Sequence, residues 1–595
     1  MLWCVLLREE IVHIESELSF GVVVVGGGIA GCCAAIEAAR AGASVCLASA
    51  SGVFSGSSFY PGTWGLGLIG PRDAADIDDM VETILRVGRG VPDAALVESF
   101  VRGIPEAIAA LEAMGVSLKR PANPDELQYI PCFDHSLRMW RGLERDSMKH
   151  GFERALCEEG VARFDRCELL DIAMDDGRVR GALFFDHSAK RFRAVSCEAI
   201  VLAGGGVAGL YKRSLSTSGN SATVQALAAR CGARLVNLEF MQIMPGLVSP
   251  RRNIVFNEKA FRFARARDAS GEPIARDVLE ARSGHGPFSC ERAGAPLDFA
   301  MEACGDEGME ITCDVGDGSP EFVRTFSDWL ERECGVSASA PARIAPYAHA
   351  SNGGIAIDEH GACGVPGLFA AGECTGGMHG ADRIGGLASA NALVFGRRAG
   401  VAAAKFASRS ESCDDRSAAG FCFPLGSESV SFEIEERAYS SSSAILRELR
   451  ETMSAHCMIS RDAEGLKAAA SAISALRARI EEPAFASGLA SSAVATVAPA
   501  PMAAPSFTAA LKPEPALGSV PAAAPALKPD PTLESAPSPV PEHAAMAALM
   551  PSSDAASIAG TMRIRLQLET ASATVAAMLA RKESCGSHYR SDAVQ

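Results

Sequence analysis

Three glycines near the N-terminus have the spacing that is needed to hold a dinucleotide. Gly26, Gly28 and Gly31 fit the pattern G-x-G-x-x-G. In this pattern the first glycine permits a tight turn, the second lets the backbone approach a pyrophosphate, and the third lets a helix pack closely on a strand. The N–H groups at the start of that helix point toward the phosphates. The spacing therefore predicts a site for a dinucleotide cofactor.

The residues around these glycines form the structural unit that such a motif requires. Val22 to Val25 are a β-branched run typical of a strand buried on both faces, and an Ala-rich segment with helical character follows the glycines. A second strand is expected from Ser44 to Ala48. An acidic residue normally closes this strand and binds a ribose hydroxyl, but residues 47–49 are Leu, Ala and Ser. This unit alone does not distinguish one dinucleotide from another.

Length, charge and cysteine content limit the class of protein. The 595 residues allow two to four domains, and the net charge of −16 argues against a nucleic-acid partner. No apolar run reaches the roughly 18 residues of a membrane span, and the opening MLWCVLL lacks the basic region of a signal peptide. The 19 cysteines contain no C-x-x-C pair. We therefore expect reduced thiols in the cytoplasm, no metal site and no integral membrane segment.

Glycine-rich stretches recur along the chain. Residues 51–71 are too rich in Gly and Ser for a regular element, and they fit either a surface loop or a backbone-lined wall for a flat cofactor. Residues 201–206 are a second apolar run that ends in glycines, and glycines return at 346–400. This pattern indicates a cofactor domain that is interrupted and then resumed.

The last third of the chain combines helical segments with a biased one. Residues 432–482 have helical periodicity, whereas residues 486–556 are rich in Ala, Pro and Ser and contain the repeat ALKPEPALGSVP and ALKPDPTLESAP. Such a composition buries too little apolar surface to offset the entropy of ordering, so we expect a disordered insert. A last helix is expected from about Thr561 to Arg581.

Several ordered motifs together resemble those of the FAD-dependent succinate dehydrogenase/fumarate reductase flavoprotein family, and L-aspartate oxidase is closest in several of them. The motifs are GGGIAG, SGSSFYPGTWG, AIVLAGGGVAGLY, LEFMQIMP, PYAHASNGGI, LFAAGECTGGMHGADRIGG and the terminal RKESCGSHYR. The resemblance implies an α/β fold with a Rossmann-like FAD-binding domain, an inserted α+β capping domain and a C-terminal helical domain. The implied bounds are 1–19 for an N-terminal extension, 20–236 and 345–410 for the FAD-binding domain, 237–344 for the cap, and 430–595 for the helical domain with the insert 486–556.

The resemblance also implies which residues bind FAD. They are Gly26, Gly28, Gly31, Ser49, Ser55, Gly56, Ser57, Ser58, Gly62, Gly65, Ala203, Gly204, Gly205, Glu373, Ala388 and Ser389. Ser57 stands where membrane-bound relatives attach the flavin through a histidine, so non-covalent FAD is implied. Ala388 replaces the usual serine.

The implied chemistry is hydride transfer between the flavin and a carbon of a small organic acid whose carboxylates are held by fixed donors. His349 and Arg383 match two such donors. Met244 occupies the place of a third, the histidine of F-x-Q-x-H-P, and a thioether cannot donate to a carboxylate. The arginine of the cap that transfers protons in this family has no match; Arg292 is the nearest catalytic candidate, and His285 is close in sequence.

We therefore expect an FAD-dependent oxidoreductase, L-aspartate oxidase-like or fumarate reductase-like, that acts on a small organic acid and uses an electron acceptor that the sequence does not identify. One alternative is the flavoprotein subunit of a multi-subunit reductase with a redox partner subunit. Another is an FAD-binding protein with degraded catalysis and an interaction role, which Met244 and the unmatched arginine would favour.

Overall fold

The structure is a computed structural model that describes residues 2–7, 10–15, 18–217, 219–316, 318–409, 421–423, 435–481 and 552–593. The expected insert lies outside the described residues up to Pro551. No helix among the described residues combines the length and the apolar character needed to cross a membrane. The described residues also contain no group of His, Cys, Asp and Glu side chains that could hold a metal ion.

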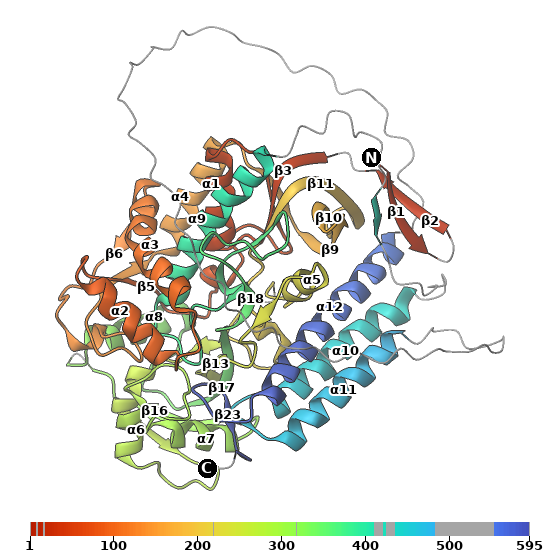
Figure 1. Ribbon diagram of the computed structural model, residues 1–595. Helices are drawn as coiled ribbons and strands as arrows, with labels where there is room; N and C mark the ends of the chain where they lie inside the picture. The colour runs from red at the N-terminus through yellow and green to blue at the C-terminus, as the bar shows by residue number, and fades with distance from the viewer. Residues whose placement is uncertain are drawn as a thin grey trace, which may run out of the picture. The chain divides into compact units, whose positions relative to one another are not determined.

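A seven-stranded sheet carries the glycine motif (Figure 1). Its order is β8-β4-β3-β11-β10-β9, and β19 also pairs with β11. The strands β8, β4, β3, β11 and β19 are parallel, whereas β9 and β10 add an antiparallel extension. The bounds are β3 Leu18–Val25, β4 Val45–Ser49, β8 Ala162–Asp165, β9 Cys167–Asp175, β10 Arg178–Asp186, β11 Arg191–Leu202 and β19 Leu368–Ala370.

Two helices from distant parts of the chain cover one face of this sheet. They are α1 (Ile29–Arg40), which follows the glycine motif, and α9 (Leu387–Ser408). Small residues let their backbones approach, because a Cβ at Gly396 would lie 2.6 Å from the carbonyl oxygen of Ala30 and a Cβ at Gly400 would lie 2.2 Å from that of Ala34. The nucleotide-binding part is thus completed by a segment that follows the cap in sequence.

Further helices and a small sheet complete this part. The helices are α2 (Asp76–Val87), α3 (Ala94–Ala113), α4 (Arg145–Glu158) and α5 (Val224–Arg230). The antiparallel sheet has the order β5-β7-β6, with β5 Leu66–Gly70, β6 Leu118–Lys119 and β7 Met139–Leu143. A second small sheet pairs β12 (Leu235–Val236), β18 (Gly354–Ala356) and β20 (Thr375–Gly376).

The cap is built on a five-stranded antiparallel sheet of order β14-β13-β17-β16-β15. The strands are β13 Met241–Ser249, β14 Ile254–Val255, β15 Ala264–Arg267, β16 Met309–Cys313 and β17 Ala342–Ser351, and the helices are α6 Arg276–Arg282, α7 Ala295–Ala303 and α8 Glu321–Cys334. Its separate core includes Phe256, Phe261 and Phe326. The domain boundary expected between 344 and 345 falls inside β17, which continues from the cap sheet toward the glycine-rich part.

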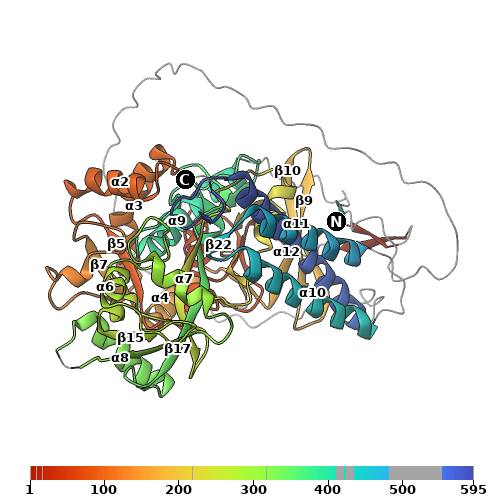
Figure 2. The ribbon, with the colours of Figure 1, turned by 90° about the horizontal axis from the view of Figure 1, so that it is seen from below.

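Three long helices pack together in the C-terminal part (Figure 2). They are α10 (Glu435–His456), α11 (Ala463–Glu481) and α12 (Ser552–Ala580). The start of α12 differs from the expectation, since residues 552–556 fall within the expected disordered insert and are helical. No proline follows Pro551, so nothing in the Ala-rich sequence after it interrupts a helix.

The remaining strands are short. The strands β1 (Leu2–Leu7), β2 (Glu10–Glu15) and β21 (Phe421–Phe423) form one sheet, and β22 (Ser460–Arg461) pairs with β23 (Tyr589–Arg590). The architecture confirms the expected fold class: an α/β nucleotide-binding part of Rossmann type, an inserted α+β cap and a C-terminal helical part.

Candidate functional site

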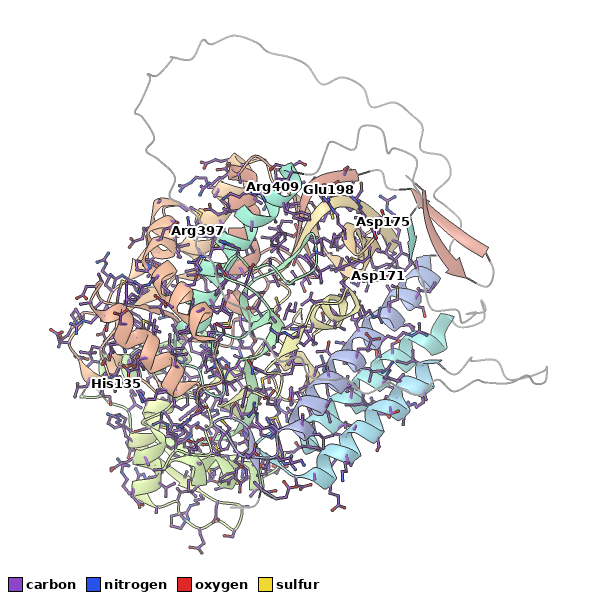
Figure 3. The ribbon with its side chains drawn as sticks, viewed as in Figure 1. His135, Asp171, Asp175, Glu198, Arg397 and Arg409 are labelled. Carbon is purple, nitrogen blue, oxygen red and sulfur yellow. The ribbon has the colours of Figure 1, made fainter. Side chains whose placement is uncertain are left out.

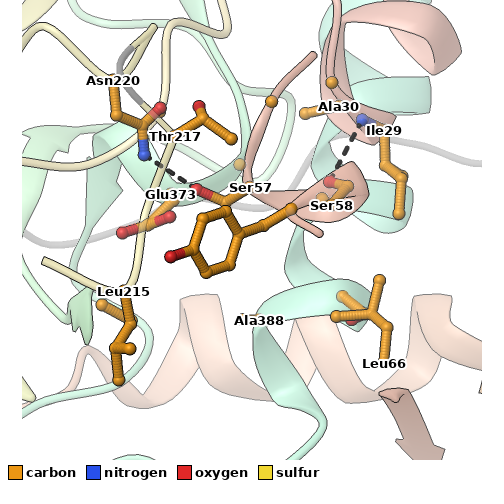
Figure 4. Close-up of a pocket in the computed structure, with 18 of the residues that line it drawn as sticks. Ile29, Ala30, Ser57, Ser58, Leu66, Leu215, Thr217, Asn220, Glu373 and Ala388 are labelled. Atoms are coloured by element: carbon orange, nitrogen blue, oxygen red, sulfur yellow. Dashed lines mark hydrogen bonds between the residues drawn. The ribbon is translucent and has the colours of Figure 1, made fainter. Parts of the chain in front are cut away.

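A large cavity is lined by residues at the carboxyl ends of the parallel strands and by residues of the cap. Figure 4 shows part of its lining. The cavity brings together the following expected cofactor residues: Gly26, Gly28, Ser49, Ser55, Gly56, Ser57, Ser58, Gly65, Ala203, Gly204, Gly205, Glu373, Ala388 and Ser389. Of the expected catalytic residues, His349 and Arg383 line the same cavity. Gly31, Gly62 and Arg292 do not line it.

The glycines of the motif differ in what surrounds them. Gly26 has φ +117°, and a Cβ there would lie 2.2 Å from the carbonyl oxygen of Ala203. A Cβ at Gly31 would lie 1.7 Å from the carbonyl oxygen of Gly26, so Gly31 allows α1 to pack against the turn. At Gly28 the nearest atom to a Cβ is Ser58 Oγ, 3.8 Å away. Because Gly28 lines the cavity, a side chain there would take up cavity space.

Both helices that cover the sheet begin at this cavity with a glycine as the N-cap residue. Gly28 precedes α1 and Gly386, with φ +85°, precedes α9; neither glycine has a side chain that could cap its helix, and at α1 a long hydrogen bond from the N–H of Ile29 goes to Ser58 Oγ instead. The first N–H groups of a helix have no partner within the helix, and they carry the positive end of its dipole. The start of α1 therefore suits a phosphate, and the start of α9, at Ala388 and Ser389, suits a polar ring edge.

The end of β4 has no acidic residue, and its last side chain contacts the backbone of the loop that follows. Ser49 Oγ donates to the carbonyl oxygen of Gly52 at 2.9 Å and so shapes the loop after the strand. Asp165 lies opposite Ser49 on the neighbouring strand β8, and its Oδ1 accepts the N–H of Val53 at 2.8 Å. A carboxylate beside this loop thus comes from β8, and the backbone N–H of Val53 already uses it.

The serine loop after β4 is tied to two other segments. Ser57 Oγ accepts a hydrogen bond from Asn220 Nδ2 at 2.9 Å, and Ser58 Oγ accepts the N–H of Ile29 at 3.5 Å (Figure 4). Ser55 Oγ donates to the carbonyl oxygen of Gly52 at 2.5 Å. Gly62 serves a packing role, because a Cβ there would lie 2.2 Å from the carbonyl oxygen of Asn253 in the cap.

Glu373 contributes a carboxylate to the cavity. It belongs to a short 3₁₀ turn, Gly372–Cys374, that follows β19. Its Oε1 accepts the N–H of Ser351 at 3.0 Å. Burial raises the pKa of Glu373, and the N–H of Ser351 together with the positive charge of Arg383 opposes that rise.

His349 and Arg383 reach the cavity from different parts of the fold. His349 is the extra residue of a β-bulge in β17, because Gln242 pairs with Ala350 and the next residue, Ile243, pairs with Ala348. A bulge of this kind turns a side chain away from the regular alternation of the strand. Arg383 lies in the loop before α9, and its Nη2 donates to Gln242 Oε1 at 2.5 Å.

Both side chains keep a nitrogen without a protein partner. His349 Nδ1 and Arg383 Nε are buried and have no hydrogen-bond partner among the described residues. Burial, aided by the charge of Arg383, lowers the pKa of His349 to about 4. Burial lowers the pKa of Arg383 to about 10. At neutral pH the pair therefore consists of a neutral imidazole and a charged guanidinium, and because both residues line the cavity they suit a polar ligand there.

Met244 contributes an apolar part of the cavity wall. It is 7% exposed and packs with Tyr60, Leu215, Val255 and Tyr347. Of these, Tyr60, Leu215 and Val255 also line the cavity. The side of the cavity where the family has a histidine is therefore apolar.

The structure does not bring Arg292 to the cavity. Its guanidinium lies over the ring of Phe133, with Cζ 5.2 Å from the ring centroid, and burial lowers its pKa. His285 is also away from the lining, and burial lowers its pKa to about 3, although its neighbours Gly286 and Pro287 line the cavity. This loop therefore lines the cavity through Gly286 and Pro287, and neither His285 nor Arg292 lines it.

Several polar lining residues were not predicted from the sequence. Cys132 and Glu258 both line the cavity, and Cys132 Sγ donates to Glu258 Oε1 at 3.3 Å. Asn220 and Glu168 line it as well. Each comes from a segment without a recognisable motif, so only the three-dimensional arrangement reveals it.

The parallel sheet, the glycine turn after β3 and the two helix starts with glycine N-caps on one cavity define a dinucleotide-binding protein of Rossmann type. Comparison with family models matches residues 21–388 to the FAD binding domain and residues 555–595 to the fumarate reductase flavoprotein C-terminal region. The chain therefore belongs to the succinate dehydrogenase/fumarate reductase family of FAD-dependent flavoproteins, whose members are oxidoreductases.

Individual relatives and solved structures agree with this assignment. The chain is 31% identical over 427 residues to one of the subunits of the fumarate reductase (CoM/CoB) of Methanothermobacter marburgensis, covering 66% of this chain and 74% of that protein. It is 32% identical over 403 residues to L-aspartate oxidase of Halobacterium salinarum, covering 64% and 75%. The fold resembles a solved structure of E. coli quinol fumarate reductase with a TM-score of 0.69, at 20% identity, over 97% of this chain and 92% of that one.

Proposed function

We propose that the cavity binds FAD without a covalent bond and that hydride passes there between the flavin and a small organic acid. The activity would be L-aspartate oxidase-like or fumarate reductase-like. The observation that carries this proposal is the convergence of His349 and Arg383, with buried donor atoms that lack protein partners, on the cavity that also contains the start of α9. When bound, FAD supplies the hydride donor or acceptor.

The residues present fit this cofactor. The start of α1 at Gly28 would hold the pyrophosphate, with Gly26 and Gly31 shaping the turn. The remaining contacts would come from Ser49, Ser55, Gly56, Ser57, Ser58, Gly62, Gly65, Ala203, Gly204, Gly205, Glu373, Ala388 and Ser389, although Gly62 would act only through loop packing. Ser57 has no ring nitrogen to form a covalent flavin link, and its hydroxyl is engaged by Asn220.

Arg383 and His349 would divide the work of holding a carboxylate. Arg383 would supply the charge, since its pKa of about 10 keeps it protonated at neutral pH. His349, with a pKa of about 4, would supply a neutral N–H donor. Gln242 would fix the guanidinium in place through its Oε1. A charged and a neutral donor together suit one carboxylate.

The apolar wall sets a limit on the rest of the substrate. Because Met244 replaces a donor and is surrounded by Tyr60, Leu215 and Val255, this side of the cavity would receive a carbon chain more readily than a second carboxylate. We therefore propose an acid with one carboxylate on Arg383 and a less polar remainder. The group that delivers or removes the proton would not be Arg292, which lies outside the cavity.

If the chain is the flavoprotein subunit of a multi-subunit reductase, a redox partner subunit would be the electron acceptor or donor. Some relatives of this chain are named as subunits, among them the one from the fumarate reductase (CoM/CoB) of Methanothermobacter marburgensis. A cytoplasmic location would agree with the cysteines whose side chains the structure describes, from Cys32 to Cys585, because these are free thiols. Copurification from the native host under mild conditions would test the partner.

The experiment for the main proposal is an absorbance screen of the purified yellow protein with carboxylic and amino acids. Acid precipitation should release the flavin into the supernatant; flavin that stays with the pellet would contradict the non-covalent assignment. Anaerobic bleaching by an amino or organic acid followed by peroxide on reoxidation supports an oxidase. Reoxidation of viologen by fumarate or a related unsaturated acid supports a reductase. If no acid changes the flavin spectrum in either regime, the protein is an FAD-binding protein without this activity.

A further inference from the structure

The end of the cavity away from His349 is closed by residues that contact the last long helix. Beyond Ser51, at the carboxyl end of β4, the cavity is lined by Glu168 and Leu169 at the start of β9 and by Ser221 and Thr223 before α5. In Rossmann folds the adenosine half of a dinucleotide lies over the end of this second strand. These residues therefore form the adenosine end of the proposed FAD site.

Arg563 of α12 holds one of these residues through a charged network. Its Nε lies 2.6 and 2.8 Å from the two carboxylate oxygens of Glu168, and its Nη2 also contacts Glu168. His187 Nε2 approaches the same carboxylate at 3.1 Å. Burial alone would raise the pKa of Glu168, but the hydrogen bonds from His187 and Arg563 outweigh it and lower the pKa. The carboxylate is therefore charged, 5% exposed, and fixed by a helix that lies almost 400 residues later in the chain.

Gln567, one turn further along α12, contacts the segment before α5, which lines the same end of the cavity. Its Nε2 donates to the carbonyl oxygen of Ser221 at 2.9 Å, and Ser221 Oγ lies 3.0 Å from Thr223 Oγ1. Residues four apart on a helix share a face, so Arg563 and Gln567 present their side chains to the same surface.

The same face of α12 is anchored beneath these contacts. Ala555, Ala559 and Met562 pack on the antiparallel strands β9 to β11, and Leu566 joins the core beneath the parallel strands. A second ion pair joins Arg230 of α5 to Glu569 at 2.7 Å. Burial raises the pKa of Asp171 of β9, which is labelled in Figure 3, to about 6, and the charge of Arg230 opposes that rise.

We propose that α12 is a working part of the FAD site, in which Arg563 and Gln567 are positioning residues that fix the adenosine end through Glu168 and Ser221. The affinity for FAD then depends on the docking of a helix that belongs to the C-terminal part. The inference rests on the proposed FAD orientation in the cavity. It predicts that removing the contacts of α12 lowers the affinity for the adenosine half of FAD and leaves the binding of the flavin half unchanged.

The test is to titrate the full-length protein, stripped of flavin, with FAD and separately with FMN, which lacks the adenosine half. Arg563→Gln should weaken FAD binding about tenfold or more, the loss expected when charge-assisted hydrogen bonds that hold the wall are removed. FMN affinity should not change. Arg563→Lys, which keeps the charge, should recover part of the FAD affinity.

A matched control lies in the same helical part. Arg479 of α11 pairs with Glu448 of α10 at 2.5 Å, and neither residue lines the cavity. Arg479→Gln should leave both affinities unchanged. If Arg563→Gln does not fold, Gln567→Leu serves in its place and should weaken FAD binding several-fold.

The outcomes separate this inference from the proposed function. Equal losses of FAD and FMN affinity, or a lower melting temperature of the flavin-free protein with unchanged FAD affinity, would show that α12 is only structural and would overturn the inference. If the unaltered protein binds no FAD, the proposed function fails first. If it binds FAD and the Arg563 variants bind it equally well, only the inference fails.

Discussion

Replacing Met244 by histidine tests whether the apolar wall selects the substrate. Met244 is 7% exposed and faces both the cavity and a cluster that contains Tyr60, Leu215 and Val255. Met244→His puts a donor where related flavoproteins have one. If the substrate lies as proposed, this donor reaches the end of the acid that is remote from Arg383.

The substitution should change two quantities, the free energy of unfolding and the free energy of substrate binding. Loss of the buried thioether packing should lower the free energy of unfolding by about 1–3 kcal/mol. A new hydrogen bond to a carboxylate contributes about 1.5–3 kcal/mol to binding, which corresponds to roughly 10–150-fold in affinity. The substituted protein should thus be less stable and should prefer dicarboxylates over monocarboxylates of the same length by that factor relative to the unaltered protein.

The assay is a spectral titration of the oxidised flavin with matched acids, such as succinate against butyrate. A titration with glutarate against pentanoate checks the chain length. Met244→Leu is the control, because it keeps the wall apolar with a similar volume. If Met244→His changes the affinity for mono- and dicarboxylates equally, Met244 does not face the substrate, and the reasoning about the wall is refuted.

Three further predictions concern the donors and the glycine motif. Arg383→Met removes the only charge proposed for the carboxylate and should weaken acid binding at least tenfold with FAD affinity nearly unchanged, measured by the same titrations; full retention of acid binding would contradict the assignment. His349 has a pKa of about 4, below that of an unfolded histidine, so the unfolded chain takes up a proton first as the pH falls. The stability due to its neutral form is present above about pH 6.5 and is lost toward pH 4, by up to about 3 kcal/mol, and urea unfolding should show a smaller acid-induced loss in His349→Gln than in the unaltered protein. Gly31→Ala should lower the melting temperature of the flavin-free protein, because the added Cβ would lie 1.7 Å from a carbonyl oxygen. Gly28→Ala should change that melting temperature by no more than a few degrees but should still lower the affinity for FAD. Equal effects of the two substitutions on the melting temperature would show that the two glycines have one role.

The strand–turn–helix unit at Val22 to Gly31 could be predicted because its information is local. Four consecutive valines predict a buried strand, and the three spaced glycines predict the turn and the helix that follow it. The structure shows β3, the turn and α1 in these places. His349 and Arg383, the proposed donors, could be named because each lies in a recognisable motif. Their convergence depends on a bulge in β17, which no local pattern indicates.

The parts that the sequence did not predict depend on long-range contacts. Arg292 lies close in sequence to residues that line the cavity, but its guanidinium lies over the ring of Phe133 and not in the cavity. The early start of α12 is hard to predict because this helix is apolar on two sides: Met562 packs on the sheet, and Leu568 packs on α10 and α11. Two apolar faces blur the 3.6-residue periodicity on which a helix prediction relies.

The close packing of α1 against α9 has a consequence for how the protein is made. The face of α1 around Ala30 and Ala34 is matched to Gly396 and Gly400, which leave the ribosome long after α1 does. At 5–20 residues per second this delay is roughly 20–70 s. During that time the nascent sheet lacks its cover, and the start of α9 that would meet the flavin does not exist. The aggregation risk during synthesis therefore falls in this interval.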